Sequence, residues 1–181
     1  MFIIHNLIGA GATATYTASN RLTTPINLFT NVVSSMVLPI TSRSKTKSLL
    51  APPTRNLILA TLTFSAIICI AGTHFAPLLG MLLGHKYSSA GPVIALLMAG
   101  YGVGASAQVV TGWIYGSGIG VNRVPLFSAL TTLLGLFVVV LGGLQRNLIL
   151  ASAGLLANQG TMFVLVTVLA IKTSSGLARS D

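Results

Sequence analysis

The chain has 181 residues, of which 53% are apolar and only 6% are charged, and its formal net charge is +9. This composition excludes a soluble domain with a polar exterior and indicates a multi-pass membrane protein. In a soluble protein, so high a net positive charge would suggest nucleic-acid binding. Here the ten Lys and Arg lie mostly in short links between apolar runs, without interleaved aromatic residues. We therefore expect no nucleic-acid partner.

Acidic side chains are almost absent from the sequence. Asp181, the last residue, is the single Asp or Glu. The chain thus has no pair of carboxylates for acid–base catalysis, no carboxylate ligand for a metal, and no Asp or Glu within the membrane to carry a coupling proton. Cys69 lies alone in an apolar run and cannot form an intrachain disulfide. We expect no enzyme activity, no cofactor and no metal site.

The N-terminal residues 2–7 are apolar but too few to cross a membrane, and Gly9 and Gly11 then interrupt the pattern. We expect them to form the last turn of a helix whose beginning lies outside the sequence. A cleavable signal is not predicted, because the segment lacks a basic region and a cleavage site.

The first complete helix, expected over residues 11–38, is apolar on one half of its circumference and polar on the other. Wound at ~100° per residue, about one third of the circumference forms a polar arc, which comprises Thr13, Tyr16, Thr17, Asn20, Thr24, Asn27, Asn31, Ser34 and Ser35. Hydroxyls and amides find no hydrogen-bond partner in hydrocarbon, so this arc must line a wet cavity or pack against other helices. Pro25 predicts a kink, and Pro39 predicts the end of the helix.

Arg21 lies at the edge of this polar arc. A guanidinium near the middle of a membrane costs about 2.5–3.5 kcal/mol on insertion scales, and such residues usually face the interior of a bundle. We favour a cavity lined by the arc and Arg21. The alternative is that Arg21 snorkels to the interface while its polar neighbours join helices together.

The second helix, expected over residues 56–79, is nearly all apolar and is predicted to face lipid over much of its surface. The third, over residues 92–115, carries glycines at multiples of four, and small residues at that spacing let another helix approach closely. The row comprises Gly100, Gly104, Gly112 and Gly116, with Gln108 completing it. Gln108 is either a link between helices or a cavity residue.

Two further helices are expected over residues 124–141 and 148–171. The second of them carries Asn158 and Gln159 near its centre, and we interpret these amides as a helix-pairing device rather than a second polar patch. The transmembrane bundle thus covers residues 1–172, and residues 173–181 are expected to be a disordered tail. The fold class is an all-α polytopic membrane helix bundle with about five transmembrane helices.

The distribution of basic residues predicts the orientation. The loop after the first helix, the third loop and the tail together hold seven, which are Arg43, Lys45, Lys47, Arg55, Arg123, Lys172 and Arg179. The alternate links hold Lys86 and Arg146. Because cytoplasmic loops carry the excess of Lys and Arg, the loop at 41–55 and the C-terminus are predicted to be cytoplasmic.

Three stretches carry a family resemblance. The first is Gly9-(x6)-Tyr16-(x4)-Arg21-Leu22-(x2)-Pro25, continuing to Leu38-Pro39-(x3)-Arg43; the second is LGHKYSSAGP at 83–92; the third is the small-residue helix end reaching Tyr115 and Gly118. Together they resemble the C-terminal half of polysaccharide and O-antigen (Wzx-type) flippases, which belong to the multidrug/oligosaccharidyl-lipid/polysaccharide exporter superfamily.

The resemblance implies one half of a two-bundle transporter fold whose cavity lies between the bundles. The chain is then a fragment, or it pairs with a partner chain in place of a missing N-terminal bundle. The implied function is to move a lipid-linked oligosaccharide (a polyprenyl-pyrophosphate-linked glycan, as in lipopolysaccharide synthesis) across the cytoplasmic membrane by alternating access. Arg21 would bind the anionic pyrophosphate. The candidate hydrogen-bond partners of sugar or phosphate are Asn20, Thr24, Asn27 and Asn31.

Three rival functions fit the same residues. A peptidoglycan-precursor flippase would use the same lipid–pyrophosphate chemistry. A drug or cation exporter of the same superfamily would have to obtain its membrane carboxylates from a missing half. Finally, the chain could be a non-transporting membrane subunit or an inactive truncated fragment, whose polar arc merely packs against a partner.

Overall fold

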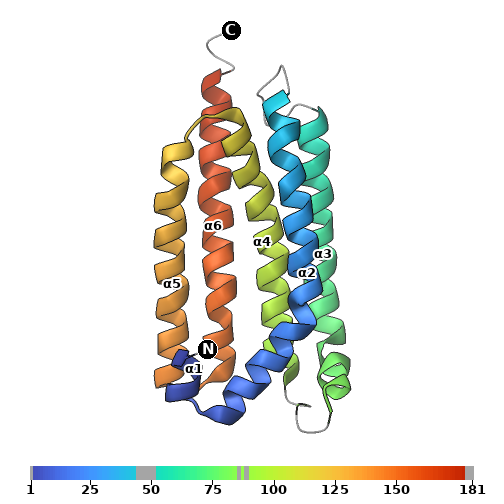
Figure 1. The fold of residues 1–181 in the computed structure, drawn as a ribbon, viewed down its shortest axis with the longest axis vertical. Helices are drawn as coiled ribbons and strands as arrows, with labels where there is room; N and C mark the ends of the chain where they lie inside the picture. The colour runs from blue at the N-terminus through green and yellow to red at the C-terminus, as the bar shows by residue number, and fades with distance from the viewer. Residues whose placement is uncertain (1, 44–51, 85–86, 88–89, 178–181) are drawn as a thin grey trace.

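The structure is a computed structural model that describes residues 2–43, 52–84, 87 and 90–177. All the regular elements of these residues are helical (Figure 1): α1 (Phe2–Leu7), α2 (Ala10–Arg43), α3 (Pro52–Leu82), α4 (Gly91–Ser117), the 3₁₀ helix η2 (Val121–Arg123), α5 (Val124–Leu144) and α6 (Leu148–Leu177). The predicted all-α helix bundle is confirmed.

Four of the described helices are long and apolar enough to cross a membrane, over Thr54–Leu82, Gly91–Ser117, Val121–Leu144 and Leu148–Ser174. Helix α2 has 34 residues and so is ~50 Å long at 1.5 Å per residue. It exceeds the ~30 Å of bilayer hydrocarbon, but its hydroxyls and amides make it too polar to join the four. The structure is thus that of a membrane-embedded multi-pass protein with one additional, half-polar long helix.

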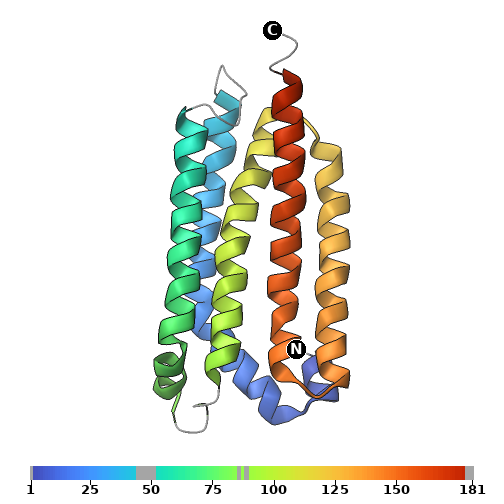
Figure 2. The ribbon, with the colours of Figure 1, turned by 180° about the vertical axis from the view of Figure 1, so that it is seen from behind.

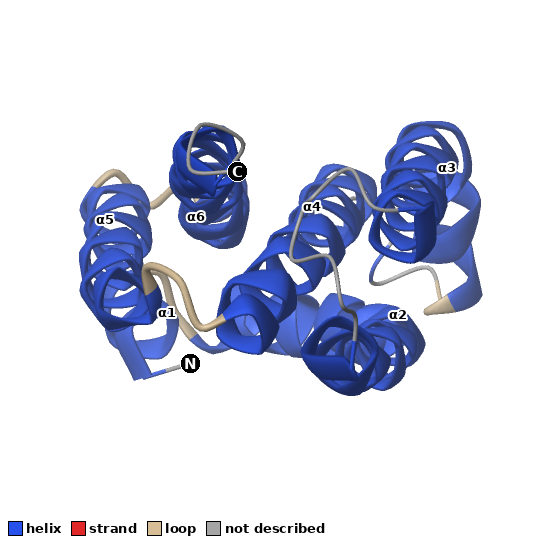
Figure 3. Ribbon diagram, turned by 90° about the horizontal axis from the view of Figure 1, so that it is seen from above, coloured by secondary structure: helices blue, strands red, loops and turns tan. Residues whose placement is uncertain are grey.

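Helix α4 lies at the centre of the bundle. Helices α2, α3 and α6 all pack against it, and α5 packs on the far side of α6. Seen from above, α2 and α3 lie on one side of α4, and α5 and α6 lie on the other (Figure 3). The view from behind shows the same two pairs on either side of α4 (Figure 2). Direct contact between α2 and α3 is slight.

The glycines of α4 contact its neighbours, as their spacing predicts. A Cβ atom built on Gly100 would lie 2.9 Å from Leu155 Cγ of α6. One built on Gly116 would lie 2.6 Å from Thr41 Cβ of α2. Side chains at these positions would hold the helices apart, so close helix packing is confirmed there.

Two predicted helix ends are wrong. Helix α2 continues through Pro39 to Arg43. Pro39 removes only the backbone donor that would have bonded the Ser35 carbonyl, and membrane helices tolerate such a proline without ending. Helix α6 continues to Leu177, so residues 173–177 of the expected disordered tail are helical. Residues 178–181 lie outside the described residues.

Large apolar side chains cover the outer faces of α3 and α5. On α3, Ile70 is 61% exposed and Leu78 is 57% exposed; on α5, Leu133 is 62% exposed. In water such surfaces would be unfavourable, whereas lipid is a matching solvent for them. The prediction that the second long segment faces lipid over much of its surface agrees with this exposure.

Candidate functional site

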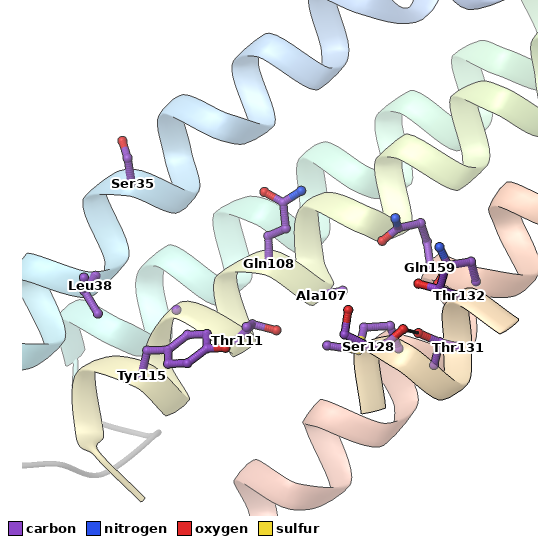
Figure 4. Close-up of a pocket in the computed structure, with 13 residues that line it drawn as sticks. Ser35, Leu38, Ala107, Gln108, Thr111, Tyr115, Ser128, Thr131, Thr132 and Gln159 are labelled. Carbon is purple, nitrogen blue, oxygen red and sulfur yellow. Dashed lines mark hydrogen bonds between the residues drawn. The ribbon is translucent and has the colours of Figure 1, made fainter. Parts of the chain in front are cut away.

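A cavity of about 610 Å³ opens among α2, α4, α5 and α6. Its lining comprises Ser35, Leu38, Ala107, Gln108, Thr111, Gly112, Tyr115, Ser128, Thr131, Thr132, Asn158, Gln159 and Met162. Three of these side chains are amides and six carry hydroxyls, and none is charged. In the close-up view, Gln108 and Thr111 of α4 lie between Ser35 of α2 and Thr131 of α5 (Figure 4).

Helical spacing explains how these side chains meet. On α4 the cavity residues recur at intervals of three and four, from Gln108 through Thr111 to Tyr115, so they share one face of that helix. Another face of α4 carries Val109 and Trp113, which are buried in the main apolar core. Helix α4 therefore contributes both to the core and to the polar cavity.

Two cavity amides are positioned by glycines on neighbouring helices. A Cβ atom on Gly104 of α4 would lie 3.0 Å from Gln159 Oε1, and one on Gly135 of α5 would lie 2.8 Å from Asn158 Cβ. Both amides thus pack against partner helices and also line the cavity. The sequence pattern favoured pairing alone, whereas the structure gives them both roles. Of the two possibilities left open for Gln108, the structure supports cavity lining.

The five predicted site residues do not line this cavity. Asn20 and Asn27 are half-buried, and Arg21, Thr24 and Asn31 are exposed.

One member of the polar arc does reach the cavity, namely Ser35. It follows Asn27 and Asn31 at four-residue intervals, so these three residues share one side of α2. The polar arc therefore extends from the cavity along the same side of the helix.

The sequence pattern did not reveal which side of α2 packs against the bundle. Its buried polar residues are Ser19, Thr23, Thr30 and Thr41, none of which is more than 3% exposed. Each donates its hydroxyl to a carbonyl of its own helix; Ser19, for example, donates to the Thr15 carbonyl at 2.8 Å. A Ser or Thr satisfied in this way packs like a small apolar residue. Counting hydroxyls as polar therefore hid this packing face.

Arg21 lies near one end of the bundle. The adjacent Leu22 packs against an apolar cluster that contains Ala76, Ala90 and Ile94. Ala90 directly precedes α4, and Ala76 lies in the last two turns of α3, so this cluster is at the end where α3 connects to α4. The exposed Arg21 is thus closer to an interface than the sequence suggested, and both phosphate binding and snorkelling remain predictions for it.

Asn20 has a partner within the chain. The Tyr101 hydroxyl of α4 donates a hydrogen bond to Asn20 Oδ1 at 2.8 Å. This bond joins α2 and α4 across 81 residues of sequence. It ties up one acceptor of the amide that was predicted to bind substrate.

Comparisons of the chain with protein-family models, curated proteins and solved structures gave no match. Among the described residues, His, Cys, Asp and Glu form no group of three that could hold a metal ion. The chemistry of the site therefore rests on the cavity itself, which offers uncharged donors and acceptors inside an apolar bundle.

Proposed function

We propose that this chain is part of a membrane flippase that moves a lipid-linked oligosaccharide across the cytoplasmic membrane by alternating access. The observation that carries the proposal is the cavity lined by three amides and six hydroxyls without a charged group. Sugar hydroxyls are uncharged donors and acceptors, and the amides and hydroxyls that line the cavity match them. The volume lies within the ~300–1,000 Å³ range of ligand pockets.

In this proposal the cavity faces the cytoplasm. Four basic residues belong to one end of the bundle: Arg43 ends α2, Arg55 begins α3, Arg123 precedes α5, and Lys172 lies near the end of α6. These helix ends lie together in Figure 1. The cavity residues of α4 and α5 are in the halves of their helices nearest this end. The positive-inside rule assigns such an end, and with it the C-terminus, to the cytoplasm.

The exposed polar side of α2 suits contact with a second bundle, supplied by an N-terminal half or by a partner chain. Arg21 and Ser35 are both exposed there, and hydrocarbon would be a poor solvent for either. In the assembled transporter the cavity would hold the glycan on the cytoplasmic side, and Arg21, toward the opposite end of the bundle, would contact the pyrophosphate on the far side of the membrane. A peptidoglycan-precursor flippase would use the same arrangement.

The composition of the cavity argues against the remaining rival functions. A drug or cation exporter needs carboxylates that the cavity lining does not contain. A non-transporting subunit would use its amides only to pack helices, whereas Gln108 lines the cavity. An inactive fragment would keep the same lining, and the transport activity of the assembled protein distinguishes it.

The test is binding of a polyprenyl-pyrophosphate-linked oligosaccharide to the chain in nanodiscs. Gln108→Leu should weaken binding about fivefold, because one hydrogen bond contributes about 1 kcal/mol and a factor of ten corresponds to about 1.4 kcal/mol. Gln145→Leu is the matched control, since Gln145 is exposed at the end of α5 away from the cavity. Equal affinities for the wild type and both variants would refute the proposal.

A further inference from the structure

The end of the bundle opposite the basic residues is crossed by residues 2–20, here called the closing segment. It comprises α1 and the first turns of α2. Figure 1 shows α1 at the lower end of α5, against which it packs, and α2 running obliquely from there toward α3 and α4. The segment thus connects the two helix pairs on either side of α4.

The closing segment is seated on α5 at its first helix. Ile4 is only 3% exposed, and a Cβ atom built on Gly143 of α5 would lie 2.6 Å from Leu7 Cδ1. Gly9 then turns the chain into α2 with φ of +119°, a conformation that side chains disfavour. Its amide donates to the Ile4 carbonyl at 3.2 Å.

On the other side of the bundle, the closing segment is fixed to α4. Ser19 is fully buried, and the next residue, Asn20, accepts the hydrogen bond from the Tyr101 hydroxyl at 2.8 Å. The segment is therefore attached at both ends, to α5 through Leu7 and to α4 through Asn20. The cavity lies beyond it, toward the basic end of the bundle.

We infer that the closing segment is a gate that shuts the end of the bundle remote from the basic residues, and that the Tyr101–Asn20 hydrogen bond is its latch. In this inference the cavity, which lies in the half of the bundle that carries Arg43 and Arg123, is reached from that end while the closing segment stays in place. Tyr101 thus positions the closing segment, and Asn20 is part of the gate rather than of the substrate-binding site. The inference deepens the proposed function and rests on it for the meaning of the gate, because alternating access requires the gate to open.

The test is the labelling of a cysteine in the cavity from each side of the membrane. Gln108→Cys is placed in a Cys69→Ala background, and a membrane-impermeant maleimide is added to one face or the other of sealed proteoliposomes of known protein orientation. The parent protein should react from one face only. Tyr101→Phe deletes one hydroxyl and should raise the labelling rate from the second face about fivefold, as expected from loss of a hydrogen bond worth about 1 kcal/mol.

Tyr87→Phe is the matched control, because Tyr87 packs against the apolar cluster at the same end of the bundle and belongs neither to the cavity lining nor to the latch. Gly143→Val attacks the other attachment by displacing Leu7, and it should also allow labelling from the second face. Labelling of the parent from both faces would overturn the inference, as would one-sided labelling that persists in both Tyr101→Phe and Gly143→Val. The labelling assay uses no substrate. Its outcome therefore does not depend on whether Gln108 binds a glycan, and the two proposals can fail separately.

Discussion

Replacement of Gly104 should separate the packing role of α4 from its role in the cavity. A Cβ atom at this position would lie 3.0 Å from Oε1, 3.1 Å from Cδ and 3.3 Å from Cγ of Gln159. All three atoms belong to a flexible side chain, so Gly104→Ala can be accommodated when Gln159 moves. We expect Gly104→Ala to lose glycan-lipid affinity with little change in stability.

Gly104→Leu is a larger perturbation, because its outer carbons reach beyond Gln159 to the α6 backbone. One turn earlier on α4, a Cβ atom on Gly100 would already lie 3.3 Å from the Leu156 backbone nitrogen. The two helices must then separate, and overpacking of this kind typically costs about 1–3 kcal/mol. Lower resistance to protease in detergent, and unfolding at a lower fraction of denaturing detergent, should report the loss.

Gly160→Ala on α6 is the control for both variants. A Cβ atom there would have no neighbour within 4 Å, and alanine exceeds glycine in helix propensity by about 1 kcal/mol. This variant should be at least as resistant as the wild type. Wild-type resistance in Gly104→Leu, with Gly100→Leu equally silent, would show that this face of α4 looks at lipid and would refute the packing argument.

Three further predictions address the charge, the topology and the α3–α4 contact. Arg21→Ala should abolish glycan export in the assembled transporter at normal protein level. Arg21→Lys should retain part of the export, since lysine keeps the charge but cannot form the bidentate hydrogen bonds of a guanidinium to phosphate. Normal export by Arg21→Ala would make Arg21 a snorkelling residue. Single cysteines at Ser42 and Gln145, in the Cys69→Ala background, should react from opposite faces of the membrane, and reaction from one face would contradict the orientation. The Ser65 hydroxyl of α3 lies 2.8 Å from the Ser106 hydroxyl of α4. Ser65→Ala should therefore lower the free energy of unfolding in detergent by about 0.6 kcal/mol, the mean for such bonds in membrane proteins. An unchanged denaturation midpoint would mean that this bond contributes nothing.

The long helices could be predicted because apolar runs of membrane length leave the backbone no other way to satisfy its hydrogen bonds. Close packing at the glycines of α4 could also be predicted from their spacing, although the row turns around the helix and meets α6 at Gly100 but α2 at Gly116. The cavity could not be predicted, because a helical wheel gives the direction of a side chain but does not say which helix that side chain meets. Ser128 and Thr131 stood as isolated hydroxyls in an apolar run, and only the packing of α5 on α6 brings them beside Asn158.

Arg21 stands out in the sequence because a charge in a membrane segment is costly and therefore conspicuous. The cavity is uncharged; its amides Gln108, Asn158 and Gln159 are noticeable in the sequence, but their pattern does not show that they line one cavity. Asn20 illustrates the same limit, since its partner Tyr101 lies 81 positions away. Such contacts depend on the tertiary arrangement, which local patterns do not encode.

The central place of α4 has a consequence for the order in which the chain assembles during synthesis. Helices α2 and α3 are made before α4, yet they touch each other little and both rely on α4 for their packing. Each must therefore wait in the bilayer as a separate helix until residues 91–117 arrive. For the half-polar α2 this interval is the less favourable one, because lipid offers its amides no hydrogen-bond partner. A chain interrupted before Gly91 should consequently leave α2 exposed to quality-control proteases, while the more apolar α3 persists in the membrane.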